Sequence, residues 1–297
     1  MRWQSAAGQL RRGLSSPACT ANCVACCSSA ARFWRQRNTW HFSGSFGLKT
    51  YGQVFAVRGS AYDRAMQCCP DARQQEFAQA VDAARLTSGM VVADVPAGGG
   101  YLQRYLPSGC HWLGHEPCAS FTNHGTLTGD ARPLLPLPWS DASADVAISL
   151  AGVHHIDDKR PLFRELARVT KPGGRLVVSD VATDSAVARF LDGYVGAHNS
   201  TGHEGVFLDG HTLVELRDAG WSVHRHDVQN FCWVFPDRAV MAAFCHELFD
   251  LRSSSMADTR VAIETQLGVK QLSSGQVGMD WSLMTIVAQK GPTEAVE

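Results

Sequence analysis

Hydrophobic and polar residues follow two different spacings in turn along most of the chain. Residues 71–86 place Phe77, Val81 and Ala84 on one stripe of a helix, which the Ser-Gly pair that follows should end. Residues 90–95 are instead a continuous apolar run, MVVADV, and a turn of three glycines comes soon after it. The first spacing is typical of an amphipathic helix and the second of a buried strand.

The same alternation continues towards the end of the chain. We predict further strands at 111–116, 126–130, 145–150, 175–181, 223–235 and 280–289, and further helices at 159–169 and 209–221. Repeats of strand, helix and strand with continuous apolar strands predict a parallel sheet with helices on both faces. The predicted fold class is therefore doubly wound α/β.

Two segments depart from this pattern. Residues 236–279 contain two helical patterns, which we interpret as a C-terminal helical insertion packed over one edge of the sheet. Residues 1–61 show little apolar periodicity, and we expect a basic, poorly ordered leader there. The predicted domain then covers 62–290, and residues 291–297 form a tail.

The charged residues are unevenly distributed. Residues 1–62 hold eight Lys or Arg and no Asp or Glu, whereas the rest of the chain carries all 28 acidic residues and 19 of the 27 basic ones. This acidic body argues against nucleic acid as a partner, since phosphate binding needs a basic face. No stretch reaches the roughly 20 apolar residues of a membrane span. We therefore expect a soluble, cytoplasmic protein that binds a small molecule, with no membrane span.

The basic leader leaves the location open. Its acid-free, Arg- and Ser-rich composition also fits an organelle transit peptide, a flexible extension, or an upstream start without function. The cysteines add no further constraint: Cys23 and Cys26 form a CxxC pair, but no second pair completes the four ligands of a zinc site. We expect no metal, and reduced, mostly buried thiols.

The glycine turn after the first strand predicts a ligand site. In an open parallel sheet, ligands bind at the carboxyl ends of the strands, and glycines there let backbone N–H groups approach them closely. A dinucleotide fingerprint would need glycine at position 103, which is Gln103, and the Gly-Lys-Ser/Thr of a P-loop is absent. The stretch fits the pattern D-x-x-x-G-x-G, with Asp94, Gly98 and Gly100 in place.

This motif resembles the first motif of class I S-adenosylmethionine-dependent methyltransferases, [D/E]-x-G-x-G-x-G, with Pro96 at the position of the family's first glycine. Glu116, 18 residues beyond Gly98, stands where that family places an acid after its second strand. Residues 129–149 resemble the family's third-strand segment, and residues 150–180 resemble methyltransferases of quinone biosynthesis. The resemblance covers about residues 62–290 and is firmest from 90 to 182.

The resemblance implies a Rossmann-like, seven-stranded methyltransferase sheet and S-adenosylmethionine as cofactor. It also implies that Glu116 accepts hydrogen bonds from two ribose hydroxyls, that Asp130 holds the adenine amino group, and that the backbone N–H of Ala131 meets the ring. The cofactor residues that it implies are Asp94, Ala97, Gly98, Gly100, Glu116, Asp130, Ala131, Ser149 and the lid residue Tyr62. Four of them also fit a structural role: Asp94 as a helix cap, Glu116 as a solvated turn acid, Asp130 in an Asx-turn and Tyr62 as a core tyrosine.

Candidate residues for the methyl acceptor follow the fourth and fifth predicted strands. His154 and His155 stand where the acceptor should meet the methyl group, and either can serve as a base for a hydroxyl or an acidic carbon; one of them can equally be a packed or capping residue. His198 and His203 lie in a loop over the strand ends, where substrate contacts are common. We assign these two and Trp233 to substrate binding, although an aromatic at this spacing also suits a plain core.

We therefore expect a methyltransferase that acts on a small, apolar or aromatic molecule at O or C. Two alternatives stay open. One is a thiol or metalloid acceptor, suggested by Cys68, Cys69, Cys118, Cys232 and Cys245. The other is a non-catalytic protein of this fold that binds the nucleoside as a structural or regulatory element.

Overall fold

The computed structural model describes residues 51–124 and 133–291, which belong to a single unit, 47–297. Two of the predicted cofactor residues, Asp130 and Ala131, lie outside the described residues, as does the strand predicted at 126–130. No helix in the described part of the chain is long and apolar enough to cross a membrane.

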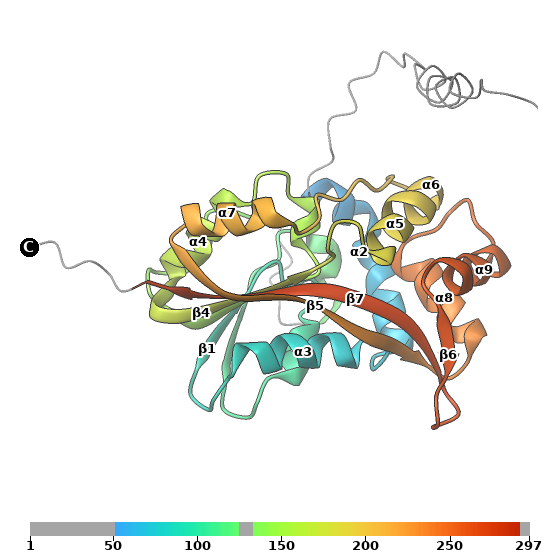
Figure 1. Cartoon of the computed structure of the whole chain (residues 1–297), viewed down its shortest axis with the longest axis horizontal. Helices are drawn as coiled ribbons and strands as arrows, with labels where there is room; N and C mark the ends of the chain where they lie inside the picture. The colour runs from blue at the N-terminus through green and yellow to red at the C-terminus, as the bar shows by residue number, and fades with distance from the viewer. Residues whose placement is uncertain (1–50, 125–132, 292–297) are drawn as a thin grey trace, which may run out of the picture. The chain divides into compact units, whose positions relative to one another are not determined.

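A mixed seven-stranded sheet forms the centre of the described structure (Figure 1). Its strands follow the order β2 (His111–Gly114), β1 (Val91–Asp94), β3 (Ala144–Leu150), β4 (Thr170–Asp180), β7 (Val277–Lys290) and β5 (Trp221–Phe235), and the short β6 (Val269–Gln271) pairs with β7. Strands β1 to β4 pair in parallel, whereas β7 runs antiparallel to both β4 and β5. The apolar patterns predicted all of these strands except β6, and they did not indicate the reversed direction of β7.

Helices cover both faces of the sheet, which confirms the doubly wound prediction (Figure 1). Helix α3 (Gln74–Ala84) packs on one face, where Phe77 shares a core with Val92 and Ile148. Helices α4 (Arg160–Val169) and α7 (Gly210–Asp218) cover the other, where Phe163 and Leu216 share a second core with Leu176. The continuous apolar strands are explained by this arrangement, since both of their faces are buried.

The first described helix, α2 (Tyr51–Cys68), shows that the predicted boundary at residue 61 is wrong. The helix begins at Tyr51, inside the segment that we expected to be a poorly ordered leader. Its own pattern is weak because glycines interrupt it, and its order comes from tertiary contacts: the Phe55 ring lies 5.3 Å from that of Phe121. A Cβ on Gly59 would come within 2.1 Å of Ser120 Oγ, so glycine permits a close approach there.

The predicted helical insertion at 236–279 is only partly helical. Helices α8 (Arg238–Leu248) and α9 (Met256–Gln266) match the two helical patterns. The segment then continues into β6 and the start of β7, because Val269–Gln271 pairs antiparallel with Val277–Met279. The insertion is therefore a helix pair followed by a β-hairpin.

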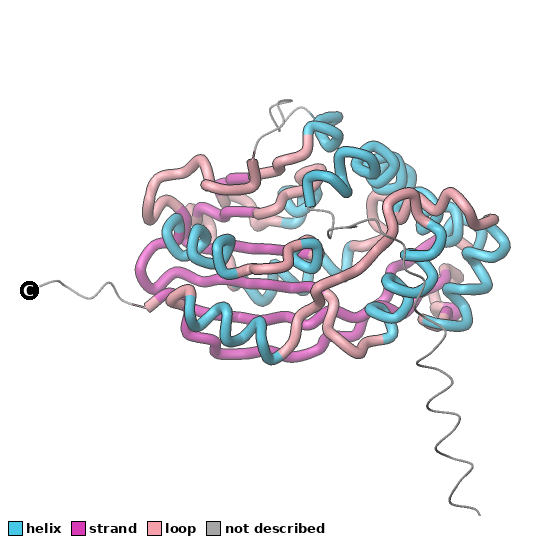
Figure 2. Tube along the Cα trace, turned by 90° about the horizontal axis from the view of Figure 1, so that it is seen from above, coloured by secondary structure: helices cyan, strands magenta, loops and turns pink. Residues whose placement is uncertain are grey.

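Short helical segments lie at the carboxyl ends of the parallel strands. They are α5 (Ala186–Phe190), the π-helix η4 (Leu191–Val195), α6 (Gly196–His198) and the 3-10 turns η1 (Tyr101–Tyr105), η2 (Ala119–His124) and η3 (Val153–His155). Together with α2, α8 and α9 they gather at one end of the sheet (Figure 2). The carboxyl ends of β1, β3 and β4 are thus covered by helices from four distant parts of the sequence.

Candidate functional site

A cleft lies over the carboxyl end of β1. Asp94 ends that strand with its side chain buried, and Trp112 Nε1 donates a hydrogen bond of 3.1 Å to its Oδ2. Burial, together with the nearby charge of Glu116, raises the pKa of Asp94 to about 7 although the hydrogen bond from Trp112 opposes this. The cleft is lined by Asp94, Pro96, Ala97, Gly98, Tyr101, Leu102, Leu150, Ala151 and Gly152, and on the α2 and α3 side by Tyr51, Phe55, Tyr62, Arg73 and Phe77, with Phe121.

The glycine turn forms part of the cleft wall. Gly98 and Gly100 have φ angles of 53° and 74°, which lie in the left-handed region that favours glycine. The N–H of Gly98 points to the Glu116 side chain and donates a hydrogen bond of 2.8 Å to Oε2. Gly100 does not line the cleft, and its N–H closes the turn by bonding to the carbonyl of Ala97.

Glu116 is a buried carboxylate with three hydrogen-bond donors. Besides the N–H of Gly98, the hydroxyl of Tyr51 donates to Oε2 at 2.9 Å and the N–H of Cys118 donates to Oε1 at 2.8 Å. Burial nevertheless raises the pKa of Glu116 to about 7. The side chain of Cys118 adds a fourth hydrogen bond to these three, so a ligand hydroxyl would share or replace one of them at the roughly four lone-pair positions of the carboxylate.

Pro96, which departs from the family motif, has a packing role. Its ring lines the cleft and lies against the turn after β3, where a Cβ on Gly152 would come within 2.7 Å of Pro96 Cγ.

The structure corrects the prediction that Ser149 is a cofactor residue. Its side chain lines neither cavity of the site, and its buried Oγ has no hydrogen-bond partner among the described residues. The cleft is instead lined by the three residues that follow it.

A second cavity adjoins the cleft. The two spaces share four residues of their walls, which are Phe55, Tyr62, Arg73 and Ala151. The remaining residues that line the second cavity, called the acceptor cavity below, are Arg58, Glu76, His154, His155, Val181, Leu191, His203, Trp233, Leu248, Phe249, Trp281 and Leu283.

Two histidines of the acceptor cavity are held by carboxylates. His154 Nδ1 lies 2.7 Å from Oδ1 of Asp180, the buried acid at the end of β4. His203 Nδ1 lies 2.7 Å from Oδ1 of Asp192, in η4. Because a carboxylate only accepts hydrogen bonds, we assign the proton of each neutral ring to Nδ1, which leaves a lone pair on each Nε2.

Burial and neighbouring groups shift the pKa values of Asp180, His203 and His155. Burial alone would raise the pKa of Asp180. The charge of His154 and the hydrogen bonds that Asp180 accepts from His154 and from the N–H of Val181 outweigh burial, so the pKa of Asp180 is lowered overall. Burial lowers the pKa of His203, although the hydrogen bond that its Nδ1–H donates to Asp192 opposes this. Burial and the charges of His154, His203 and Arg58 hold the pKa of His155 well below its usual value. His155 and His203 are therefore neutral at pH 7.

The three imidazoles form a group that could hold a metal ion, which the cysteine spacing did not predict. One nitrogen from each of His154, His155 and His203 lies within 4.8 Å of the others. The pairing of Nδ1 with a carboxylate is also common in metal sites. Against this, the permanent cation Arg58 lines the same cavity and acts on the charges of both His155 and His203.

Of the other two predicted substrate residues, Trp233 lines the acceptor cavity and His198 does not. Trp233 lines the cavity; its ring stacks on Trp281 at 4.3 Å, and its Nε1 donates to Glu76 at 2.7 Å. The prediction that His198 binds the substrate is corrected, because His198 lies outside both cavities. Its Nδ1 contacts the carbonyl of Tyr194 at 2.8 Å, and its ring packs on that tyrosine.

The described cysteines stand apart from both cavities. Cys118, Cys232 and Cys245 are buried, and neither they nor Cys68 and Cys69 line the cleft or the acceptor cavity. The thiol or metalloid alternative therefore gains no support from the described residues.

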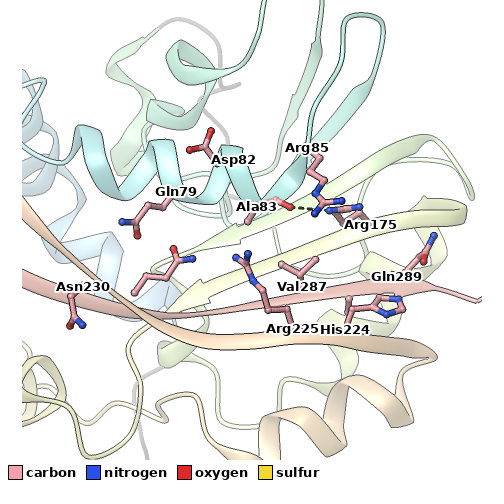
Figure 3. Close-up of a pocket in the computed structure, with 12 residues that line it drawn as sticks. Gln79, Asp82, Ala83, Arg85, Arg175, His224, Arg225, Asn230, Val287 and Gln289 are labelled. Carbon is pink, nitrogen blue, oxygen red and sulfur yellow. Dashed lines mark hydrogen bonds between the residues drawn. The ribbon is translucent and has the colours of Figure 1, made fainter.

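A wide polar groove lies at the amino ends of the parallel strands, away from these cavities (Figure 3). Arg85, Arg175, His224 and Arg225 line it, and Arg175 Nη1 donates to the carbonyl of Ala83 at 3.1 Å. None of the predicted site residues belongs to this groove, so the chemistry of the site concentrates at the opposite ends of the strands.

The sequence patterns missed several residues of the site. Tyr51, Phe55 and Arg58 were assigned to the leader, and nothing in their local pattern indicates a role. Asp180 did carry a usable signal, because it ends an apolar strand in the same way as Asp94. Asp192 carried none, since only the fold brings η4 beside the loop of His203.

Comparison with known proteins identifies part of this arrangement. Residues 93–178 match the family model described as a methyltransferase domain. A stretch of 76 residues, 24% of this chain and 29% of the relative, is 36% identical to O-methyltransferase resE of Aspergillus sclerotiorum. Another of 49 residues, 16% of this chain and 21% of the relative, is 47% identical to a demethylmenaquinone methyltransferase of Corynebacterium efficiens. The chain thus spans less than a third of the length of these two curated relatives.

Solved structures share the fold. The YcgJ protein of Bacillus subtilis matches 73% of this chain and 99% of its own with a TM-score of 0.50 and 14% identity. The methyltransferase-fold protein solved with the Trm112 methyltransferase activator of Haloferax volcanii matches 81% of this chain and all of its own, with a TM-score of 0.52 and 17% identity. At these identities the likeness concerns the fold alone.

Proposed function

We propose that this chain, which carries a class I S-adenosylmethionine-dependent methyltransferase domain, methylates a small molecule with an apolar or aromatic body at an oxygen or carbon atom. The observation that carries the proposal is the pair of adjoining cavities. One is lined by the buried carboxyl of Asp94 and by Gly98, whose N–H donates to the buried Glu116, and the other is lined by a histidine held by a buried aspartate.

The first cavity fits S-adenosylmethionine, the cofactor of such domains, by the chemistry of its acceptors. Ribose hydroxyls and an ammonium group are hydrogen-bond donors, and Glu116 and Asp94 are buried acceptors whose pKa values burial raises to about 7. Glu116 would accept from the ribose, and Gly98 would bring backbone close to the ligand. The adenine contacts of Asp130 and Ala131 stay a prediction, because both residues lie outside the described part of the chain.

In the acceptor cavity, His154 would serve as the base. When bound, S-adenosylmethionine supplies an electrophilic methyl group, so the protein's task is to align the acceptor and to exclude water. The lone pair on His154 Nε2 would take the proton of an acceptor hydroxyl or acidic carbon, and Asp180 would stabilise the imidazolium. His155 and His203 lie beside it, with ring centroids 4.0 and 5.5 Å from that of His154, and would contact the acceptor.

The lining of the acceptor cavity supports an apolar or aromatic acceptor. Trp233, Trp281 and Phe249 are buried and form one stacked wall, and Leu248 and Leu283 extend it. Two of the curated relatives are named as an O-methyltransferase and a demethylmenaquinone methyltransferase, which are consistent with oxygen or carbon as the methylated atom.

The experiment combines methyl-labelled S-adenosylmethionine with fractionated metabolite extracts and identifies the labelled product. S-adenosylhomocysteine binding is measured first by calorimetry, with Asp94→Ala as the variant that should lose it. Binding without labelled product from any fraction would favour the non-catalytic alternative. Absence of binding, or binding unchanged in Asp94→Ala, would refute the assignment of the cleft.

We also propose a location for the protein and the absence of one class of partner. We expect a cytoplasmic protein without a nucleic-acid partner, on the basis of the acidic body of the chain. A fluorescent fusion of the whole chain, compared with one that lacks residues 1–50, tests whether the basic leader instead directs it to an organelle.

A further inference from the structure

Arg58 is a buried cation without a matching anion. Its side chain comes from α2, 4% of the residue's surface is exposed, and neither Nε nor Nη1 has a hydrogen-bond partner among the described residues. Burying an unpaired charge is costly, and protein guanidinium groups in such positions usually bind a carboxylate or phosphate. Arg58 lines the acceptor cavity, so an anionic group of a ligand bound there would meet the guanidinium.

The carboxylates near the acceptor cavity are engaged elsewhere. Glu76 pairs with Arg73 and accepts from Trp233. Asp180 and Asp192 hold His154 and His203. Glu76, which lines the cavity, and the two acids that hold its histidines are therefore engaged with groups other than Arg58.

Asp250 is the remaining acid that acts on Arg58, and it too is shared. Its charge opposes the effect of burial, which lowers the pKa of Arg58 to about 10. The carboxylate itself accepts from Ser200 Oγ and forms an ion pair with Arg252. A ligand anion is therefore the group that would complete the hydrogen bonds of the Arg58 guanidinium.

The surrounding groups narrow the class of ligand. The two Nε2 lone pairs of His154 and His203 suit hydroxyl donors, and they lie in the same cavity as the guanidinium. Phe55 lies under Arg58, with its ring centroid 5.9 Å from Cζ, and the stacked tryptophan wall supplies apolar surface. A metal ion at the three histidines would instead place a second cation beside Arg58 with no free carboxylate to offset it.

We propose that Arg58 binds an anionic group of the methyl acceptor, so that the substrates of this site are apolar or aromatic hydroxy acids. The inference rests on the proposed function and deepens it by naming the substrate class. The hydroxyl would face the histidines and the carboxylate would face Arg58, with the apolar frame against Trp233.

The test compares benzoate with benzamide, which share a ring and differ in charge. Both are titrated into the full chain saturated with S-adenosylhomocysteine, and binding is followed by ligand-detected NMR. We expect benzoate to bind at least about 10-fold more tightly than benzamide, as a charge-assisted pair with a buried guanidinium requires. Arg58→Met should abolish this preference while leaving S-adenosylhomocysteine affinity unchanged.

The matched control is Arg64→Met, on the same helix. Arg64 is exposed and pairs with Glu247 at 2.9 Å outside the cavity, so this variant should keep the preference for benzoate. Thermal unfolding without ligand adds a second readout: Arg58→Met should unfold at the same or a higher temperature, because it removes an unpaired buried charge, whereas Arg64→Met should not gain stability.

The proposal is overturned by equal binding of the two probes, by no binding of either, by a preference that survives in Arg58→Met, or by a lower unfolding temperature of that variant. It is also overturned if benzoate binds only after zinc is added and is released by a chelator, because a metal at the histidines would then hold the anion. Failure of the proposed function gives a different result, loss of S-adenosylhomocysteine binding to the wild-type chain.

Discussion

The affinity for S-adenosylhomocysteine should depend on pH through Glu116. In the free protein, burial raises the pKa of this carboxyl to about 7, so it is largely protonated at pH 6. Ribose hydroxyls donate hydrogen bonds and favour the ionised form, so ligand binding should release a proton. The affinity is therefore expected to rise with pH and to level off above pH 7.

The magnitude follows from the pKa. With a pKa of about 7, about 9% of Glu116 is ionised at pH 6 and about 91% at pH 8, so binding should be roughly tenfold weaker at pH 6. Asp94 has a similarly raised pKa and is coupled to Glu116, so its titration can only steepen this dependence. Glu116→Gln should lower the affinity at pH 8 by about 5- to 15-fold for each ribose hydroxyl that it accepts from, since a hydrogen bond to a charged acceptor contributes about 1–1.5 kcal/mol more than a neutral one.

The assay is isothermal titration calorimetry of wild type and Glu116→Gln at half-unit steps from pH 6 to 8.5, in buffers of different ionisation enthalpy. The slope of log affinity against pH below 7 should be smaller by about one proton in the variant. Equal slopes in the two proteins, or a wild-type affinity that does not change between pH 6 and 8, would refute the assignment of Glu116 as the ribose acceptor.

Three other predictions concern Asp94, His154 and Gly98. Asp94→Asn should raise the free energy of unfolding of the ligand-free protein at pH 8 by about 1–3 kcal/mol. The pKa of Asp94 is raised in the folded state, so the wild type loses stability as the pH rises towards 7, and the variant does not. Urea unfolding at pH 5 and pH 8 measures the difference, and no gain at pH 8 would contradict the prediction. His154→Gln should lower kcat by about 10²- to 10⁴-fold with S-adenosylhomocysteine affinity unchanged, whereas His198→Gln should change kcat less than about twofold; equal losses would exclude His154 as the base. Gly98→Ala and Gly173→Ala both place alanine at a positive φ with open space around the Cβ, so both should lose about 1–2 kcal/mol of stability, but only Gly98→Ala should weaken S-adenosylhomocysteine binding.

Much of the fold could be predicted because it depends on local patterns. The runs at 90–95 and 175–181 are apolar throughout since both faces of β1 and β4 are covered, and the helix at 159–169 has its apolar residues on one side. Helix α2 could not be predicted in the same way. Its stripe is broken by glycines, and it is held in place by contacts with η2 and α8, which are distant in the sequence.

In the candidate site too, the features that could be predicted are local and those that could not are contacts between distant residues. The position of Asp94 and the glycine turn at a strand end is a local property, and so is the interval to Glu116. The partners of these groups are not local: Tyr51 donates to Glu116 across 65 positions, and His154 meets Asp180 across 26. Ser149 and His198 were assigned to the site from their segments, and the packing turned both side chains away from the cavities.

The sequence by itself determined a doubly wound sheet with a ligand turn after its first strand, because periodicity and glycine conformation act over a few residues. Tertiary structure decided the direction of β7, the helical start at Tyr51, and which charges are buried, paired or left without a partner. Burial depends on the elements that cover a side chain, so the raised pKa values of Asp94 and Glu116 and the isolated charge of Arg58 exist only in the folded chain.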